Sequence, residues 1–378
     1  MLVAVPTEIL PDESRVAATP ETVKKLIALG ATVRVQAGAG VASGILDADY
    51  ETAGATIAPN AAETLSGADI VLKVRRPEEA EIALLKNGAI LIGILDPYGH
   101  EDAIKALATA GILAFATELT PRITRAQVMD VLSSQANLAG YRAVIDAAAE
   151  YGRALPMMMT AAGTVPAARI FVMGAGVAGL QAIATARRLG AIVTATDVRP
   201  AAKEQVESLG AKFIAVEDDE FKQAETSGGY AREMSDAYKQ KQAELVAAHI
   251  AKQDIVITTA LIPGRPAPRL VSDAMVRSLK PGSVIVDLAV ERGGNVEGAK
   301  AGEVVLINGV KVVGHHNVPG RLAATASTLY AKNLLAFVEQ LINKEAKAIA
   351  INWDDEIIKA TALTRDGSVI HPAFQPTA

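Results

Sequence analysis

The chain has 378 residues, half of them hydrophobic, and a formal net charge of −5. This length and hydrophobic content predict two domains, each with a core of its own. The negative charge, without any basic cluster in the sequence, argues against nucleic acid as a partner. There is no cysteine, which excludes disulfides, thiolate catalysis and cysteine-ligated metal sites.

The N-terminus reads directly as an apolar strand, with no basic segment or cleavage site before it, so we expect no signal peptide. No apolar stretch reaches the roughly 18 residues that a membrane helix needs. We therefore expect no membrane span in this chain.

Apolar runs alternate with helix signals through the first 117 residues. Thr19-Pro20 has the pattern of a helix cap followed by proline at the first helical position. Alternating strands and helices predict a parallel sheet that helices cover on both faces. The expected strands are 2–5, 32–36, 68–74, 89–95 and 113–117, and the expected helices are 20–29, 47–53 and 101–110.

A second cap and proline pair, Thr120-Pro121, predicts a long helix that runs to about residue 154. Its length suits a connector between domains, and a second long helix at 323–342 would carry the chain back. The first domain is then discontinuous. We expect it at residues 1–130 plus 322–378, with the second domain at 131–321.

The segment 169–200 has the most informative pattern in the chain. Strand 170–173 leads into three glycines, then an Ala-rich helix at 180–189 and a strand at 192–196. Gly174, Gly176 and Gly179 stand at the G-x-G-x-x-G spacing. In this order the pattern indicates a dinucleotide site.

Each glycine has a separate reason. Gly174 permits a tight turn, Gly176 lets a diphosphate approach the backbone, and Gly179 lets the helix pack closely on the strand. The free N–H groups at the start of the helix, around Val177 and Ala178, attract phosphates.

Asp197 ends the second strand, eighteen residues after Gly179. A carboxylate there can accept hydrogen bonds from both hydroxyls of an adenosine ribose, and it would repel a 2′-phosphate. This favours NAD(H) over NADP(H), with Val198 next to the ribose. Arg199 argues the other way, because it could pair with such a phosphate.

Further strands and helices complete a second sheet, in which strand 254–259 runs into Ala260 and Leu261 at the edge where such sheets bind ligands. The expected fold class is α/β, with two doubly wound parallel-sheet (Rossmann-like) domains joined by long crossover helices. The charged segment 217–242 is either a solvated insertion or a lid whose Tyr230 and Met234 fold over a nucleotide. Taken alone, its composition favours the insertion.

Several stretches resemble the NAD(H)-binding component of the proton-translocating nicotinamide nucleotide transhydrogenases. The resemblance covers essentially the whole chain, and its RAQ-to-GYRA and TALIPG segments are more specific than the glycine motif. The stretches are PRITRAQVMDVLSSQANLAGYRAVIDAA, TAAGTVPAARIFVMGAGVAGLQAIATARRLGA, TTALIPGRPAP and VDLAVERGGN. The wider superfamily includes alanine dehydrogenase, which the segments around Arg15 and Lys73 also resemble.

The resemblance implies a division of labour. This component binds NAD(H), a separate component holds NADP(H), and a membrane-spanning component carries protons. Hydride passes directly between the two nicotinamides. The resemblance also implies a homodimer that is peripheral on the cytoplasmic face of the cell membrane.

The same resemblance places Arg122, Gln127, Asp130 and Ser133 beside the nicotinamide and its ribose. Arg122 would orient the carboxamide and Asp130 would hold Arg122, while Gln127 would bond a ribose hydroxyl or the neighbouring cofactor. Without the resemblance, these residues read as the exposed polar face of a helix start. The family also has a mobile loop ending in GGYA-x-x-M, which matches residues 228–234 and favours the lid.

The alternative is a free-standing amino-acid dehydrogenase of the alanine dehydrogenase kind, and a third possibility is a regulatory NAD-binding module. A dehydrogenase must move a proton as well as a hydride. Where the alanine dehydrogenases place their catalytic histidine, this chain has Ile94-Leu95, and Glu291 replaces their aspartate. We interpret Arg15 and Lys73 as ion-paired structural groups, and we expect no metal site.

Overall fold

The structure is a computed structural model that describes residues 1–222, 235–262 and 264–375. The chain divides into two compact units, Met1–Gln135 with Gly320–Ala378, and Ala136–Pro319. The sequence placed these boundaries at 130/131 and 321/322. Helix α6 (Val131–Glu150) begins in the first unit and ends in the second, whereas α12 (Ala323–Val338) lies wholly in the first.

The first unit is built on a six-stranded sheet with the order β3-β2-β1-β4-β5-β6, and every pair is parallel. Successive residues of β1 enter different core clusters, with Val3 and Val5 in one and Ala4 in the other. Both faces are therefore buried, and the predicted doubly wound sheet is confirmed. Its strands are β1 (Leu2–Val5), β2 (Thr32–Gln36), β3 (Thr56–Ala58), β4 (Ile70–Arg75), β5 (Ile90–Ile94) and β6 (Leu113–Ala116).

Short helices connect these strands, and the sequence missed β3, α3 and α4 because each has only three to five residues. Thr19 caps α1 as predicted, accepting a hydrogen bond from the Thr22 N–H. The remaining elements of this unit are α1 (Pro20–Ala28), η1 (Val41–Ser43), α2 (Asp47–Thr52), α3 (Ala61–Leu65), α4 (Glu79–Ile82), α5 (Glu101–Thr109), η2 (Thr117–Leu119), η3 (Thr124–Met129), α13 (Glu356–Thr361), β16 (Ile342–Asn343), β17 (Ala348–Ile349), β18 (Thr364–Arg365) and β19 (Ser368–Val369).

The expected helix from residue 121 was wrong at its start. A 3-10 helix at Thr124–Met129 precedes α6, and the α-helix begins at Val131. Asp130 explains the break, because its backbone is extended and its carboxylate accepts the Ser133 N–H at 2.9 Å, as an N-cap residue does. Within the described ranges, no helix combines the length and the hydropathy needed to cross a bilayer.

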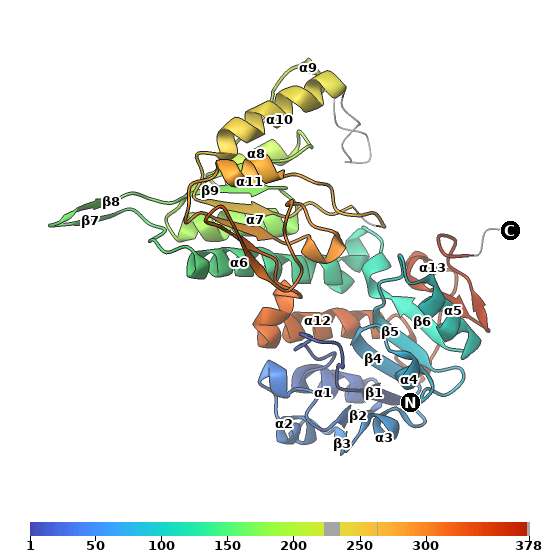
Figure 1. The fold of residues 1–378 in the computed structure, drawn as a ribbon. Helices are drawn as coiled ribbons and strands as arrows, with labels where there is room; N and C mark the ends of the chain where they lie inside the picture. The colour runs from blue at the N-terminus through green and yellow to red at the C-terminus, as the bar shows by residue number, and fades with distance from the viewer. Residues whose placement is uncertain (223–234, 263, 376–378) are drawn as a thin grey trace. The chain divides into compact units, whose positions relative to one another are not determined.

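The second unit has a seven-stranded sheet with the order β11-β10-β9-β12-β13-β15-β14 (Figure 1). All pairs are parallel except β14 with the neighbouring β15, which are antiparallel. The strands are β9 (Arg169–Met173), β10 (Ile192–Thr196), β11 (Lys212–Phe213), β12 (Ile255–Thr258), β13 (Val284–Asp287), β14 (Val304–Ile307) and β15 (Val310–Val313). The helices are α7 (Val177–Arg188), α8 (Ala202–Ser208), α9 (Asp219–Lys222), α10 (Asp236–Ile250), α11 (Asp273–Ser278), η4 (Val290–Arg292) and η5 (Val318–Leu322).

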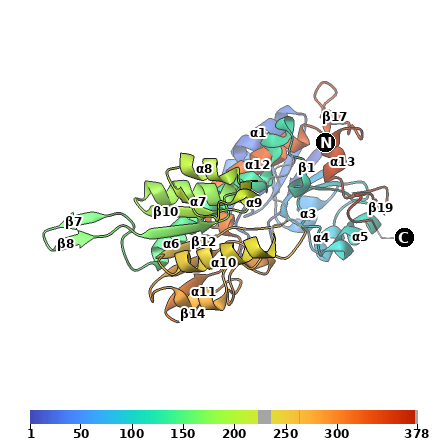
Figure 2. The same cartoon turned by 90° about the horizontal axis from the view of Figure 1, so that it is seen from above.

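A two-stranded hairpin, β7 (Met158–Thr160) with β8 (Gly163–Val165), projects from the second unit. Figures 1 and 2 show it extending beyond the helices and strands of that unit. The sequence predicted an irregular loop here. Met159 keeps 78% of its surface exposed, so the hairpin presents apolar side chains to solvent.

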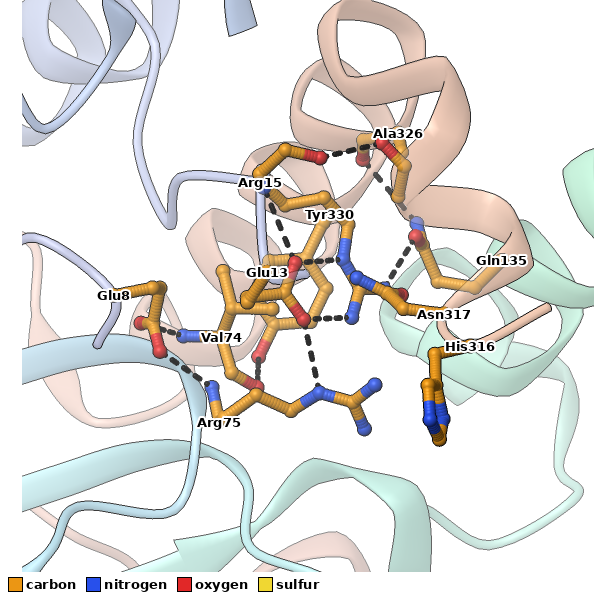
Figure 3. A network of polar contacts seen from close by, with 12 residues as sticks. Glu8, Glu13, Arg15, Val74, Arg75, Gln135, His316, Asn317, Ala326 and Tyr330 are labelled. Atoms are coloured by element: carbon orange, nitrogen blue, oxygen red, sulfur yellow. Dashed lines mark hydrogen bonds and ion pairs between the residues drawn. The ribbon is translucent and has the colours of Figure 1, made fainter. Parts of the chain in front are cut away.

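Arg15 lies in a buried polar network of the first unit (Figure 3). Its Nη2 donates to Glu13 Oε2 at 2.6 Å, and its Nη1 donates to Gln135 Oε1 at 2.9 Å. Arg75 Nε donates to the same Glu13 oxygen at 2.9 Å. The network ties the segment after β1 to β4 and to the start of α6.

Lys73 on β4 is buried in a second group of charges. Its Nζ lies 2.6 Å from Glu81 Oε1 and 3.6 Å from Glu8 Oε2. Tyr330 on α12 donates its hydroxyl to the Lys73 carbonyl at 2.8 Å. The expected ion pairs of Arg15 and Lys73 are confirmed.

We predict that Glu13→Gln destabilises the protein in a pH-dependent way. Burial alone would raise the pKa of Glu13, but the hydrogen bonds and charge of Arg15 and the charge of Arg75 outweigh it and lower the pKa from 4.5 to about 2. A depressed carboxyl pKa stabilises the fold above the unfolded-state pKa, and this stability is lost as the pH falls towards the folded-state value. Urea unfolding at pH 7 should show a loss of about 3 kcal/mol, which shrinks between pH 5 and 3.

The control is Glu21→Gln, because Glu21 pairs with Lys25 on the surface and such pairs contribute little. A Glu13→Gln variant as stable as the parent at pH 7, or a difference that stays constant down to pH 3, would contradict this account.

Candidate functional site

The glycine segment lies where the strand order of the second sheet reverses. From β9, the strands β10 and β11 lie on one side and β12 and β13 on the other. In open parallel sheets of this order, ligands bind at this switch point, beyond the carboxyl ends of the strands. The helix after the glycines begins at Val177, three residues earlier than predicted, and Gly179 lies inside it.

The three glycines differ in what requires them. Gly174 has φ +102°, and a Cβ there would lie 2.5 Å from Thr259 Oγ1. A Cβ on Gly179 would lie 1.8 Å from the carbonyl oxygen of Gly174. These two glycines are required by the turn and by the packing of helix on strand.

Gly176 is different. Its φ of −76° suits any residue, and no atom of the described residues lies within 4 Å of a Cβ built there. The fold itself does not require a glycine at this position. The open space lies at the N-cap of α7, where backbone N–H groups and the helix dipole favour a phosphate.

Helix α6 packs against the same segment through Gly140. A Cβ on Gly140 would lie 2.0 Å from the carbonyl oxygen of Ala178. No local pattern predicted the need for a glycine inside this long helix. In the structure it lets the backbone of α6 support the start of α7.

Asp197 contacts the glycine segment directly. Its Oδ2 accepts the Ala175 N–H at 2.7 Å, and Arg199 donates to both of its oxygens, from Nε at 2.9 Å and from Nη2 at 3.1 Å. Arg199 Nη2 also donates to the Ala175 carbonyl at 3.3 Å. Next to this closed group, the side chain of Val198 is exposed.

The chain leaves β12 beside the same turn. Thr259 donates its N–H to the Met173 carbonyl at 3.0 Å and its hydroxyl to the Gly174 carbonyl at 3.1 Å. Ala260 and Leu261 follow, and Leu261 is 54% exposed. The structure therefore brings Ala260 and Leu261 to the edge that carries the glycines and Asp197.

The four residues Arg122, Gln127, Asp130 and Ser133 belong to the first unit. Asp130 accepts hydrogen bonds from the backbone and the hydroxyl of Ser133, and among the described residues none joins it to Arg122. Arg122 and Gln127 are both exposed. The expected Asp130–Arg122 pair is thus replaced by a helix cap.

Tyr230 and Met234 lie outside the described residues. Within the described ranges, no group of three or more histidine, cysteine, aspartate or glutamate residues lies so that it could hold a metal ion. Sequence reasoning missed Gly140, Thr259 and Asn295, whose partners are 35 to 85 residues away or lie on another helix. For Asn295, the preceding Gly-Gly pair was a sign of a special turn.

The chain matches two family models along almost its whole length. Residues 4–139 match the alanine dehydrogenase/PNT N-terminal domain, and residues 143–372 match the alanine dehydrogenase/PNT C-terminal domain. The chain is 57% identical to an NAD(P) transhydrogenase subunit alpha chain of Rhodospirillum rubrum, over 99% of both chains.

Two solved structures are similar over nearly the full chain. A transhydrogenase from Sinorhizobium meliloti has a TM-score of 0.90 at 64% identity, covering 98% of this chain and 100% of that one. An L-alanine dehydrogenase has a TM-score of 0.83 at 26% identity, covering 99% and 98%. These matches confirm the recognition made from the sequence motifs.

We predict that Gly176→Ala separates ligand binding from folding. A methyl group fits the ligand-free protein, so its unfolding free energy should change by less than about 1 kcal/mol. It would stand where a diphosphate approaches the backbone, so NADH affinity should fall at least tenfold, measured by NADH fluorescence titration.

Gly179→Ala should instead destabilise the protein by about 1–3 kcal/mol, because its methyl group overlaps the Gly174 carbonyl. Gly152→Ala is the matched control, since no described atom lies within 4 Å of a Cβ there. Unchanged NADH affinity in Gly176→Ala would rule out a phosphate at this turn.

Proposed function

The chain belongs to the alanine dehydrogenase/PNT family, and we propose that it is the NAD(H)-binding component of a proton-translocating NAD(P) transhydrogenase. It passes hydride between NADH and NADP⁺, and the NADP(H) is held on a separate partner component. The observation that carries the proposal is the glycine turn at the switch point. Its open Gly176 has no role in the fold, in a chain 57% identical to a transhydrogenase alpha subunit.

The choice of NAD(H) for this component rests on Asp197. A carboxylate at the end of β10 can accept ribose hydroxyls and repels a 2′-phosphate. Arg199, which could have attracted such a phosphate, makes a two-point ion pair with Asp197. Since its charge is directed at the carboxylate, the pair supports the unphosphorylated nucleotide.

The remaining cofactor contacts are assigned by resemblance. Arg122 orients the carboxamide of the nicotinamide, Gln127 bonds its ribose or the neighbouring cofactor, and Ser133 adds a hydroxyl. Asp130, which caps α6 and bonds Ser133, holds that hydroxyl in place. Tyr230 and Met234 form a lid over the nucleotide.

Hydride transfer between two nicotinamides moves no proton, so the site has to hold two rings close together and exclude water. A free-standing dehydrogenase needs a general acid or base as well. The end of β5, where the alanine dehydrogenases carry their histidine, has Ile94 and the buried Leu95. This favours transhydrogenation over amino-acid oxidation.

Proton movement belongs to a membrane-spanning partner, which holds this chain on the cytoplasmic face of the cell membrane. We also propose that the chain forms a homodimer. The hairpin β7–β8 supports this, because it exposes Met157, Met158 and Met159 on a projecting arm that a second copy could cover.

Reconstitution tests the function. The purified chain, mixed with an NADP(H)-binding component of this family, should transfer hydride from NADH to NADP⁺ or to an analogue, followed by absorbance. The chain alone should not oxidise L-alanine with NAD⁺. Alanine oxidation at an enzymatic rate would establish the dehydrogenase alternative, and NADH binding without transfer in any mixture would indicate a regulatory module.

We further predict that Arg122→Ala slows hydride transfer at least tenfold in this mixture, because the nicotinamide loses its orienting contact. Arg125→Ala is a matched control in the same exposed segment. Arg125 pairs with Asp355 at 2.7 Å, whereas Arg122 makes no hydrogen bond or ion pair to any described residue. Equal rates in the two variants would remove Arg122 from the site.

A further inference from the structure

We propose that Asn295 is a positioning residue for the nicotinamide half of the bound dinucleotide. The inference rests on the proposed function and concerns the segment that follows β12. Asn295 is completely buried, and its side chain is directed at that segment.

Both backbone polar groups of Ala260 are bonded to this one side chain. Asn295 Oδ1 accepts the Ala260 N–H at 3.0 Å, and Asn295 Nδ2 donates to the Ala260 carbonyl at 2.9 Å. Nδ2 also donates to the Pro268 carbonyl at 2.8 Å. The amide thus acts as a strand partner would, and it fixes the peptide planes on both sides of Ala260.

The backbone of the same turn continues the grip. The Asn295 carbonyl accepts the N–H groups of Leu270 at 2.8 Å and Val271 at 3.0 Å. The Arg292 carbonyl accepts the Ala267 N–H at 2.8 Å. Asn295 therefore holds the beginning and the end of the segment that leaves β12.

The turn is itself fixed from below by Asp287, the last residue of β13. Its buried carboxylate accepts the N–H groups of Ala289 at 2.9 Å and Val296 at 3.0 Å. Gly294 has φ +78°, and a Cβ there would lie 2.8 Å from Asp287 Oδ2. A glycine before Asn295 is required for the turn to close on the carboxylate.

The position of the segment indicates which half of a dinucleotide it contacts. A dinucleotide crosses the switch point, and Asp197 at the end of β10 takes the adenosine ribose. The other half then lies on the side of β12, where Ala260 and Leu261 follow the strand. Leu261 and Ile262 are 54% and 45% exposed there, so the segment offers apolar contacts whose place depends on Asn295.

The test compares NADH with 5′-AMP, which has only the adenosine half. Asn295→Asp keeps the shape and the acceptor for Ala260 but removes the amide donors. The NADH dissociation constant should rise at least tenfold at pH 8, while that of 5′-AMP stays within twofold. At pH 6 the NADH defect should shrink, because a protonated carboxyl can donate one hydrogen bond.

Asn308→Asp is the control, since Asn308 is an exposed asparagine of the same unit whose amide donates to the Arg277 carbonyl. It should change neither constant. NADH affinity within twofold of the parent, or an equal loss for NADH and 5′-AMP, overturns the positioning role. If Asn295→Asp does not fold, Asn295→Ser is measured in the same way and judged by the same outcomes.

A parent protein that does not bind NADH would refute the proposed function instead. A parent that binds NADH while Asn295→Asp binds it equally well would refute this inference alone.

Discussion

Helix α7 approaches the end of β9 so closely that a methyl group on Gly179 would lie 1.8 Å from the Gly174 carbonyl oxygen. Other segments of the second unit are arranged around this contact. Asp197 accepts the Ala175 N–H, Thr259 donates to the Gly174 carbonyl, and Gly140 lies against Ala178. Backbone N–H groups held from several sides need no reordering when an anion arrives, which is what a phosphate site requires.

The same arrangement sets a condition on nucleotide binding. Each oxygen of Asp197 already accepts two hydrogen bonds, and of these four bonds Arg199 donates three and Ala175 one. A carboxylate has about four acceptor positions, so a ribose hydroxyl can bond Asp197 only by displacing one donor. The Arg199 side chain is the donor that can move, because the two backbone N–H groups are fixed by the turn.

How much the sequence could predict depended on the distance between partners. The glycines, Asp197 and the strands around them follow from one continuous stretch, and β10 was predicted with the bounds that it has in the structure. Asn295 reaches Ala260 across 35 residues, and Arg15 reaches Gln135 across 120. Such pairs depend on tertiary packing, so no local pattern reveals them.

Competing local signals explain the main error. Thr120-Pro121 and Asp130 with Ser133 are both patterns of a helix start, ten residues apart. The second prevailed, and Asp130 ends a 3-10 helix and caps α6. A residue assigned to a cofactor by resemblance therefore also has a structural task, so its substitution would change both.

The two sheets show why strand order alone does not make a nucleotide site. Both reverse direction beside their first strand, β1 in one unit and β9 in the other. In the first unit, charged side chains fill the region after the strands and neutralise one another, as Glu13 does with Arg15 and Arg75. In the second unit, glycines leave that region open to backbone N–H groups. The chemistry thus depends on which side chains follow each strand, and the shared topology provides the place.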